Sequence, residues 1–202
     1  MLPPPAFAGS SSAETLLFSN WQLAGVTTVM SGLPIDVVDS LAGSFYGLNV
    51  GTLARPSWAP GATRKTATTN IPAGYFFNPS AFVRPIVGVN QAIPSSNGGA
   101  IANAAGTDIG NVGRNVLRGP VQHSFDVAIT RRFPLKDSRA VEFRAEFFNL
   151  LNNVNFANPV SNLNNATVDA VTGAVIDAGD FGRIISTSSN PRIIQWAVKF
   201  HF

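Results

Sequence analysis

Five charged side chains between residues 126 and 146 have the types and the spacing that could do chemistry: Asp126, Arg132, Glu142, Arg144 and Glu146. Paired carboxylates could exchange protons in a general acid–base reaction. However, nothing near them in the sequence resembles a nucleophile or a cluster of metal ligands, and acidic and basic residues alternate along the segment. The pattern therefore favours a structural lattice of ion pairs over a catalytic or substrate site. We expect no enzymatic activity and no cofactor.

Two predicted strands position these charges. Residues 121–133 ("VQHSFDVAITRRF") and residues 140–151 ("AVEFRAEFFNLL") alternate apolar and polar side chains with the period of two that is typical of β-strands. The second segment contains good helix formers, but its charges also follow the period of two, so we favour a strand. The short connection "PLKDS" between the segments predicts a hairpin.

The hairpin places the charges on one face of the predicted sheet. If the turn centres on Lys136, Asp126 lies opposite Glu146, and Ala128 lies opposite Arg144. The remaining charged side chains of the group then lie diagonal to these positions, within reach of long side chains. The alternating signs of the charges on this face would allow the side chains to neutralise one another.

The composition leaves two classes of protein to which the chain could belong. The chain has 202 residues, 15 of them Phe, no Cys, 12% charged residues and a net charge of +3. Its arginines are scattered rather than clustered, which gives no support to nucleic-acid binding. Its longest apolar run is far below the roughly 18 residues that a membrane-spanning helix needs. Residues 1–15 lack the pattern of a signal peptide and are expected to be disordered. These features leave a soluble all-β protein or a membrane β-barrel.

The lengths of the connections favour the barrel. Further strands are predicted over residues 16–30, 33–40 and 192–202, and Ser31-Gly32 leaves room only for a tight turn between the first two. Two long connections, residues 41–120 and 152–191, alternate with the short ones. Outer-membrane barrels combine short periplasmic turns with long extracellular loops. We therefore predict an all-β fold in which about five antiparallel strands form part of a transmembrane outer-membrane β-barrel.

The last predicted strand, "RIIQWAVKFHF", has one apolar and one polar face. The apolar side chains fall on every second position: Ile194, Trp196, Val198, Phe200 and Phe202. In a barrel they would face the outer-membrane lipid, while Lys199 would join the charged lattice on the lumen face. Backbone groups in lipid must all be paired, so this strand would have to help close a barrel.

Other candidate sites are weak. The two histidines, His123 and His201, have no potential ligands at metal-binding spacing. The oxygen-rich segment around Asp169, Asp177 and Asp180 could be imagined to bind calcium, but its spacing fits no EF-hand loop. The glycine-rich segment "GNVGRNVLRGP" lacks the ending of a phosphate-binding loop. We therefore predict neither a metal site nor a nucleotide site.

Several segments occur in an order that resembles a known family: "NWQLAGVTTVMSGLPIDVV", "YFFNPSAF", "GNVGRNVLRGP", "FDVAITRRFPL", "VEFRAEFFNLLNNVNFANP", "FGRI" and "PRIIQWAVKFHF". Together they resemble the carboxyl-terminal end of Oar-like TonB-dependent outer-membrane transporters. The resemblance covers residues 16–202 and implies a barrel of about 22 strands, of which this chain would supply a fragment. A plug domain and a TonB box are not recognisable in the sequence.

The resemblance also implies a function and a set of partners. The parent protein would move a bulky nutrient or a protein across the outer membrane of a Gram-negative bacterium, powered by TonB through the plug. The partners would be the remaining strands, the plug, TonB and the barrel-assembly machinery, which reads the terminal aromatic strand. The alternative is a surface or adhesion role for an outer-membrane protein with large loops.

Overall fold

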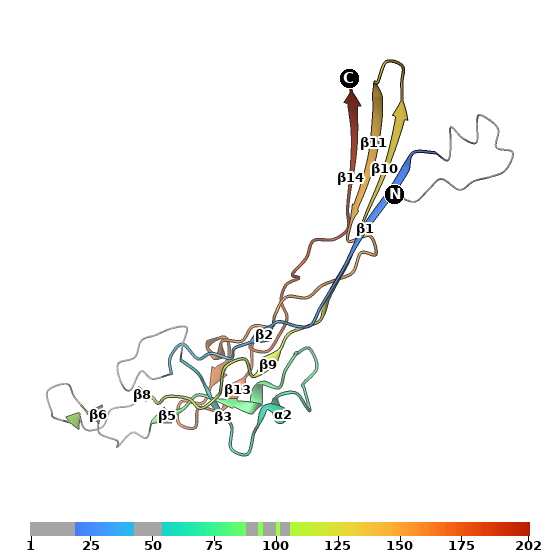
Figure 1. The fold of residues 1–202 in the computed structure, drawn as a ribbon. Helices are drawn as coiled ribbons and strands as arrows, with labels where there is room; N and C mark the ends of the chain where they lie inside the picture. The colour runs from blue at the N-terminus through green and yellow to red at the C-terminus, as the bar shows by residue number, and fades with distance from the viewer. Residues whose placement is uncertain (1–18, 43–53, 88–92, 95–99, 102–105) are drawn as a thin grey trace. The chain divides into compact units, whose positions relative to one another are not determined.

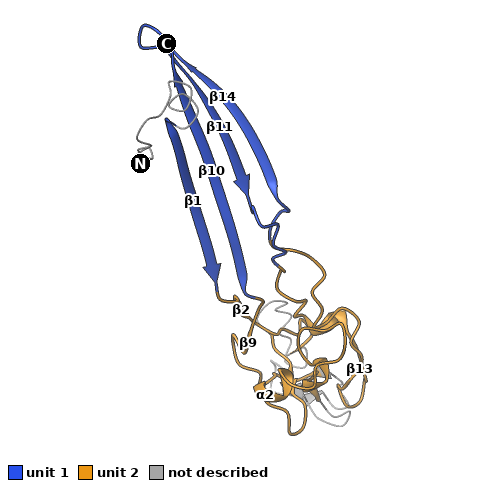
Figure 2. Cartoon of the chain, turned by 90° about the vertical axis from the view of Figure 1, so that its right-hand side faces the viewer, with its two compact units in different colours: residues 1–30, 121–155, 189–202 blue, residues 31–120, 156–188 orange. Residues whose placement is uncertain are grey.

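The computed structural model describes residues 19–42, 54–87, 93–94, 100–101 and 106–202. The chain divides into two compact units, which Figure 2 distinguishes by colour. Unit 1 comprises residues 1–30, 121–155 and 189–202, and unit 2 comprises residues 31–120 and 156–188. The start predicted to be disordered, residues 1–15, lies outside the described residues, as do the first three positions of the strand predicted over 16–30.

Unit 1 is a four-stranded antiparallel sheet with the order β1-β10-β11-β14. Its strands lie side by side in Figure 1: β1 (Trp21–Met30), β10 (Gln122–Pro134), β11 (Ala140–Phe148) and β14 (Ile193–His201). Residues 135–139 join β10 to β11 at one end of the sheet, which we call the turn end. The chain leaves for unit 2 after β1 and after β11 at the other end, which we call the loop end. The predicted all-β class with antiparallel strands is confirmed.

The boundaries of β10 and β14 agree with the prediction within one residue, whereas β11 begins as predicted but ends earlier. The predicted strand extended to residue 151, whereas β11 ends at Phe148. Asn149 and Asn152 adopt left-handed backbone conformations, with φ of 51° and 53°, which cannot continue a strand. The segment that could have been a helix is therefore a strand that ends in asparagine turns.

The prediction of a strand over residues 33–40 was wrong. Only β2 (Pro34–Ile35) forms there, and it pairs with β9 (Leu117–Arg118) in unit 2. The period of two in this segment has a different cause, because Ile35, Val37 and Asp39 are buried within unit 2. Consequently β1 pairs directly with β10, the sheet contains four strands among the described residues, and β1 runs toward the loop end.

The two segments expected to be long loops, residues 41–120 and 152–191, supply most of unit 2. Its described elements are short: β3 (Ser57–Trp58), α2 (Arg64–Ala67), η2 (Pro79–Ala81), β4 (Phe82–Val83), β5 (Ile86–Val87), β6 (Ile93–Pro94), β7 (Ala100–Ile101), β8 (Gly106–Thr107), η3 (Leu163–Asn165), β12 (Thr167–Val168) and β13 (Val175–Asp177). Among the described residues, no helix has the length and apolar character needed to cross a membrane.

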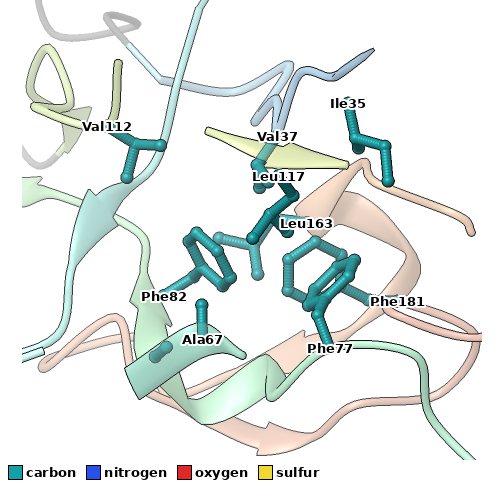
Figure 3. Packing of buried hydrophobic residues seen from close by; sticks show 10 residues of the cluster. Ile35, Val37, Ala67, Phe77, Phe82, Val112, Leu117, Leu163 and Phe181 are labelled. Carbon is teal, nitrogen blue, oxygen red and sulfur yellow. The ribbon is translucent and has the colours of Figure 1, made fainter. Parts of the chain in front are cut away.

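Unit 2 has its own hydrophobic core, shown in Figure 3. Three phenylalanine rings, those of Phe77, Phe82 and Phe181, pack edge to face with centroid separations of 5.1–5.8 Å. Ala67 of α2 and Leu163 of η3 are fully buried beside them. Each fully buried Phe or Leu side chain stabilises a fold by about 1.5–3 kcal/mol. The residues between the strands of the sheet therefore form a folded body rather than open loops.

A buried ion pair joins three distant segments of unit 2. The Arg84 guanidinium donates two hydrogen bonds to the Asp39 carboxylate, with N···O distances of 2.9 and 3.0 Å, and a third to the Asn164 side chain at 2.6 Å. The Asp39 side chain is completely inaccessible to solvent, and that of Arg84 is 12% exposed. Two parallel bonds fix the geometry of such a pair as well as adding energy.

A second ion pair in unit 2 is more exposed. Arg55 donates to the Asp36 carboxylate at 3.1 Å, and the backbone N–H of Asn115 donates to the same carboxylate oxygen at 2.6 Å. These bonds hold the pKa of Asp36 below its usual value, and the hydrogen bond from Arg55 has the largest effect. A lowered pKa in the folded state means that the resulting stabilisation is present at neutral pH and is lost as the pH falls through that pKa.

Candidate functional site

The sheet of unit 1 has one charged face and one apolar face, and these faces are the candidate site. Directly opposed residues of neighbouring strands share a face, so the register assigns each side chain. The six charged residues predicted to line a lumen fall on one face: Asp126, Arg132, Glu142, Arg144, Glu146 and Lys199. Ile194, Trp196, Val198 and Phe200 fall on the other. That the first face lines a lumen and the second meets lipid stays a prediction.

The register of the hairpin differs from the predicted one by two residues. Ala128, rather than Asp126, lies opposite Glu146, and Arg132 lies directly opposite Glu142. The turn centres one position later than predicted, because Asp137 and Ser138 both adopt left-handed conformations with φ of 59° and 65°. The predicted opposition of Asp126 and Glu146 was therefore wrong. A shift of two residues keeps every side chain on its predicted face.

One ion pair and one contact between a carboxylate and an imidazole lie on the charged face. Arg144 contacts Glu146 at 2.6 Å along β11, and Glu142 contacts the His201 ring at 3.3 Å across to β14. Lys199 lies directly opposite Glu142 on β14. The alternation of the last predicted strand places His201 on the lumen face with Lys199, but its contact with Glu142 was not predicted. The pairing of Arg144 with Glu146 favours a structural role for these side chains over proton transfer.

Asp126 has a role outside the lattice. Its carboxylate accepts a hydrogen bond of 2.8 Å from the backbone N–H of Asn149, in the first turn after β11. It thereby helps to fix the loop end of the sheet, where the backbone N–H of Leu150 also donates to the carbonyl of Phe125.

An asparagine cluster completes the loop end of the sheet; we define it as Asn149 and Asn155, which are 6% and 4% exposed. The Asn155 side chain accepts a hydrogen bond from the backbone N–H of His123 and donates one to the His123 carbonyl. The amide thus makes the two hydrogen bonds to β10 that a neighbouring strand would make. The Asn149 side chain donates to the carbonyls of Asn153 and Asn190, so it joins the segments after β11 and before β14. The motif "FFNLLNNVNFANP" therefore secures three strand ends at once.

The apolar face carries a row of aromatic contacts. The Trp196 ring lies 5.4 Å from that of Phe143 and 6.2 Å from that of Phe147 on the neighbouring strand. Phe202 follows the end of β14, with its ring stacked 6.1 Å from that of Phe200. Trp196 and Val198 are 61% and 70% exposed. In water such a surface would be unfavourable, since large exposed apolar patches mark interaction sites.

Arg131 lies on the apolar face, a position that was not predicted. It directly opposes Trp21 on β1 and Phe143 on β11. Its guanidinium carbon is 5.0 Å from the centroid of the Trp21 ring and 4.3 Å from that of Phe133. The signal was present in the sequence, because Arg131 continues the alternation of Phe125, Val127 and Ile129.

Neither edge of the sheet is closed within the described part of the chain. The outer sides of β1 and β14 pair with no further described strand, so the described strands form an open sheet. Within the described residues, no group of three acidic or histidine side chains could hold a metal ion.

The Asp169 carboxylate accepts three hydrogen bonds from Val171 and Thr172. These bonds, led by those from Thr172, lower the pKa of Asp169 and account for its conformation without a cation.

Comparison with known protein families gives one match. The profile of the family described as "Outer membrane beta barrel domain" matches residues 4–195. No curated protein and no solved structure shows a significant match to the chain.

Proposed function

Because the chain belongs to the family of outer membrane β-barrel domains, we propose that its sheet is the carboxyl-terminal sector of an Oar-like TonB-dependent transporter. The parent protein moves a bulky nutrient or a protein across the outer membrane of a Gram-negative bacterium. Other strands, a plug and TonB complete the machinery, and the barrel-assembly machinery inserts it.

The observation that carries this proposal is the two-faced sheet, whose two edges are open within the described strands. An outer-membrane barrel presents an apolar band to lipid and a polar wall to its lumen, and the sheet has one face of each kind. Four strands cannot enclose a lumen, since the smallest barrels of this class have about eight. Within the described part of the chain the outer sides of β1 and β14 pair with no further strand, so we infer that other strands complete the barrel, as in the large barrels of transporters.

The folded body of unit 2 favours transport or adhesion over a purely structural barrel. Unit 2 has a buried core and a buried ion pair, which a passive connection between strands does not need. The alternative function is therefore adhesion to a surface through unit 2. TonB dependence separates the two functions, because adhesion needs no energy from the inner membrane.

Growth of deletion strains tests the transport function. We expect deletion of the gene for the complete receptor and deletion of TonB to abolish growth on the same bulky compound in a panel of sole nutrients. The receptor gene supplied on a plasmid restores growth in the first strain only. If the receptor deletion leaves growth on the whole panel unchanged but reduces attachment to surfaces, the adhesion function replaces the transport function.

Labelling of single cysteines tests the orientation of the sheet. The chain has no Cys, so Ala73→Cys in unit 2 and Lys136→Cys in the turn between β10 and β11 each provide one thiol at an exposed position. We expect a membrane-impermeant maleimide to label the first variant on whole cells, and the second only after the outer membrane is opened, because short turns of such barrels are periplasmic. Labelling of Lys136→Cys on intact cells would mean that the sheet runs the other way.

A further inference from the structure

Two arginines of the glycine-rich segment "GNVGRNVLRGP" lie beside an ion pair of unit 2. The pair joins Arg55 to Asp36, whose carboxylate accepts bonds of 3.1 and 3.5 Å from the guanidinium and one of 2.6 Å from the backbone N–H of Asn115. The bond from Arg55 lowers the pKa of Asp36 most, and the charge of Arg114 adds to this effect. Arg114 therefore lies near Asp36, whose charge Arg55 already balances.

The second arginine, Arg118, lies on the same side of the pair of strands β2 and β9 as Asp36. Arg118 is opposite Pro34, and both are exposed, whereas Leu117 and Ile35, the next pair, are buried. Alternate residues of an extended segment point to the same side. Asp36 follows Pro34 by two positions, in a segment whose burial alternates, so it shares the exposed side with Pro34 and Arg118.

Arg114 and Arg118 carry positive charge that no carboxylate of the described residues neutralises in an ion pair. Both side chains are exposed, and each has an exposed asparagine beside it. Asn115 follows Arg114 directly, and the Asn158 side chain lies against the residue that follows Arg118. This part of unit 2 thus presents two guanidinium groups and two amides to the solvent.

These side chains suit a ligand that carries both carboxylates and hydroxyl groups. A guanidinium binds a carboxylate through two parallel hydrogen bonds, and an asparagine amide both donates to and accepts from hydroxyl groups. A chain of acidic sugars presents both groups repeatedly along its length. An acidic peptide lacks such a series of hydroxyl groups, and a single-stranded nucleic acid stacks its bases on aromatic rings, which these four side chains do not include.

We propose that an arginine–amide cluster, defined as Arg114, Asn115, Arg118 and Asn158, binds a soluble polymer of acidic sugars. The two arginines bind separate carboxylates of one polymer chain, and the amides bind its hydroxyl groups. The inference goes beyond the proposed function, because a polymer held by unit 2 serves transport and adhesion alike. Its test measures binding without any energy source, so binding can fail while the growth experiment succeeds, and the reverse.

Two polymers with the same sugar backbone provide a matched test. We expect the complete receptor in detergent to bind fluorescently labelled polygalacturonate, and to bind its fully methyl-esterified form, which has no charge, far more weakly. Arg114→Gln and Arg118→Gln should each weaken binding about fivefold, the upper end of the effect of one exposed ion pair. The double variant should weaken binding about twentyfold, since the arginines bind separate carboxylates.

A third arginine of the same unit is the control. Arg64 is exposed in α2, and Arg64→Gln removes the same charge but should weaken binding less than about twofold, because Arg64 lies outside the cluster. Arg114→Lys keeps the charge and should weaken binding less than Arg114→Gln does. A loss for Arg114→Lys as large as that for Arg114→Gln would mean that the charge does not bind the polymer.

Three other outcomes would overturn the proposal. Equal binding of polygalacturonate and its methyl ester would mean that no carboxylate is recognised. Equal losses for Arg64→Gln and Arg118→Gln would mean that only the overall positive charge attracts the polymer. Binding of polyglutamate as tight as that of polygalacturonate would mean that the hydroxyl groups contribute nothing and that the cluster binds acidic chains of any kind.

Discussion

Replacement of Arg84 by methionine is expected to unfold unit 2 at much lower urea concentrations. The change leaves the Asp39 carboxylate, which is fully buried, without the guanidinium that contacts it at 2.9 and 3.0 Å. Removing one partner of a buried ion pair costs about 3–5 kcal/mol. With a dependence on urea of about 2 kcal/mol per molar, the unfolding midpoint should fall by roughly 2 M. Trypsin cleavage of unit 2 after brief exposure to urea, in membranes that contain the complete protein, measures this midpoint.

Two further variants separate the buried charge from general damage. Arg55→Met removes the partner of Asp36, whose side chain is 40% exposed, and should cost about 1 kcal/mol or less. Asp39→Asn combined with Arg84→Met removes both charges and should regain part of the stability lost in Arg84→Met, because no buried carboxylate remains unpaired. If Arg84→Met and Arg55→Met shift the midpoint equally, Asp39 is accessible to water and the ion pair does not hold unit 2 together.

The strands of the sheet could be predicted because each carries a long alternation of its own. β10, β11 and β14 all appear near their predicted positions, since a period of two over nine or more residues can be read locally. Residues 33–40 show the same period for another reason. Ile35 and Val37 alternate with less buried neighbours, and the third buried position is Asp39. Asp39 thus occupies a position of the alternation that is otherwise filled by apolar side chains. A carboxylate at such a position indicates that the segment belongs to a protein interior with an arginine nearby, rather than to a lipid-facing strand.

Unit 2 could not be predicted, because its contacts join residues far apart without any local pattern. The core rings of Phe77, Phe82 and Phe181 meet across about a hundred positions of the sequence. The strands of unit 2 are two or three residues long, which is too short for a period to show. The sequence of these segments therefore predicts loops, whereas their described residues form a folded body with its own core.

The faces of the sheet were easier to predict than the pairs on them. A shift of the register by an even number of residues leaves every side chain on its face, whereas an odd shift moves it to the other face. The predicted register of the hairpin differed from the observed one by two residues, so the faces were predicted correctly. The pairs depend on the turn itself, where left-handed Asp137 and Ser138 move the centre by one position. For the same reason the contact of Glu142 with His201 needed the structure, while the common face of Glu142 and Lys199 did not.

An arginine introduced on the apolar face near the middle of β10 is expected to be far more damaging than one introduced on the charged face. Val127 lies on the apolar face between Gly25 and Phe147, and Ala128 lies on the charged face directly opposite Glu146. An arginine that faces lipid at the bilayer midplane costs about 2–4 kcal/mol. Because Gly25 leaves room beside Val127, the cost of Val127→Arg would come from the charge rather than from a clash. Ala128→Arg gains an acidic neighbour on a face where charges already lie.

The amount of folded receptor in the outer membrane measures this difference. Val127→Arg should strongly reduce the heat-modifiable, folded band on a gel, while Ala128→Arg should leave it close to that of the unsubstituted protein. The two variants carry the same new side chain at adjacent positions, so their overall charge and helix or strand propensity are matched. An equal loss would mean that neither face meets lipid. A larger loss for Ala128→Arg would mean that the charged face is the one turned to the membrane, or that β10 is shifted by one residue in the assembled barrel.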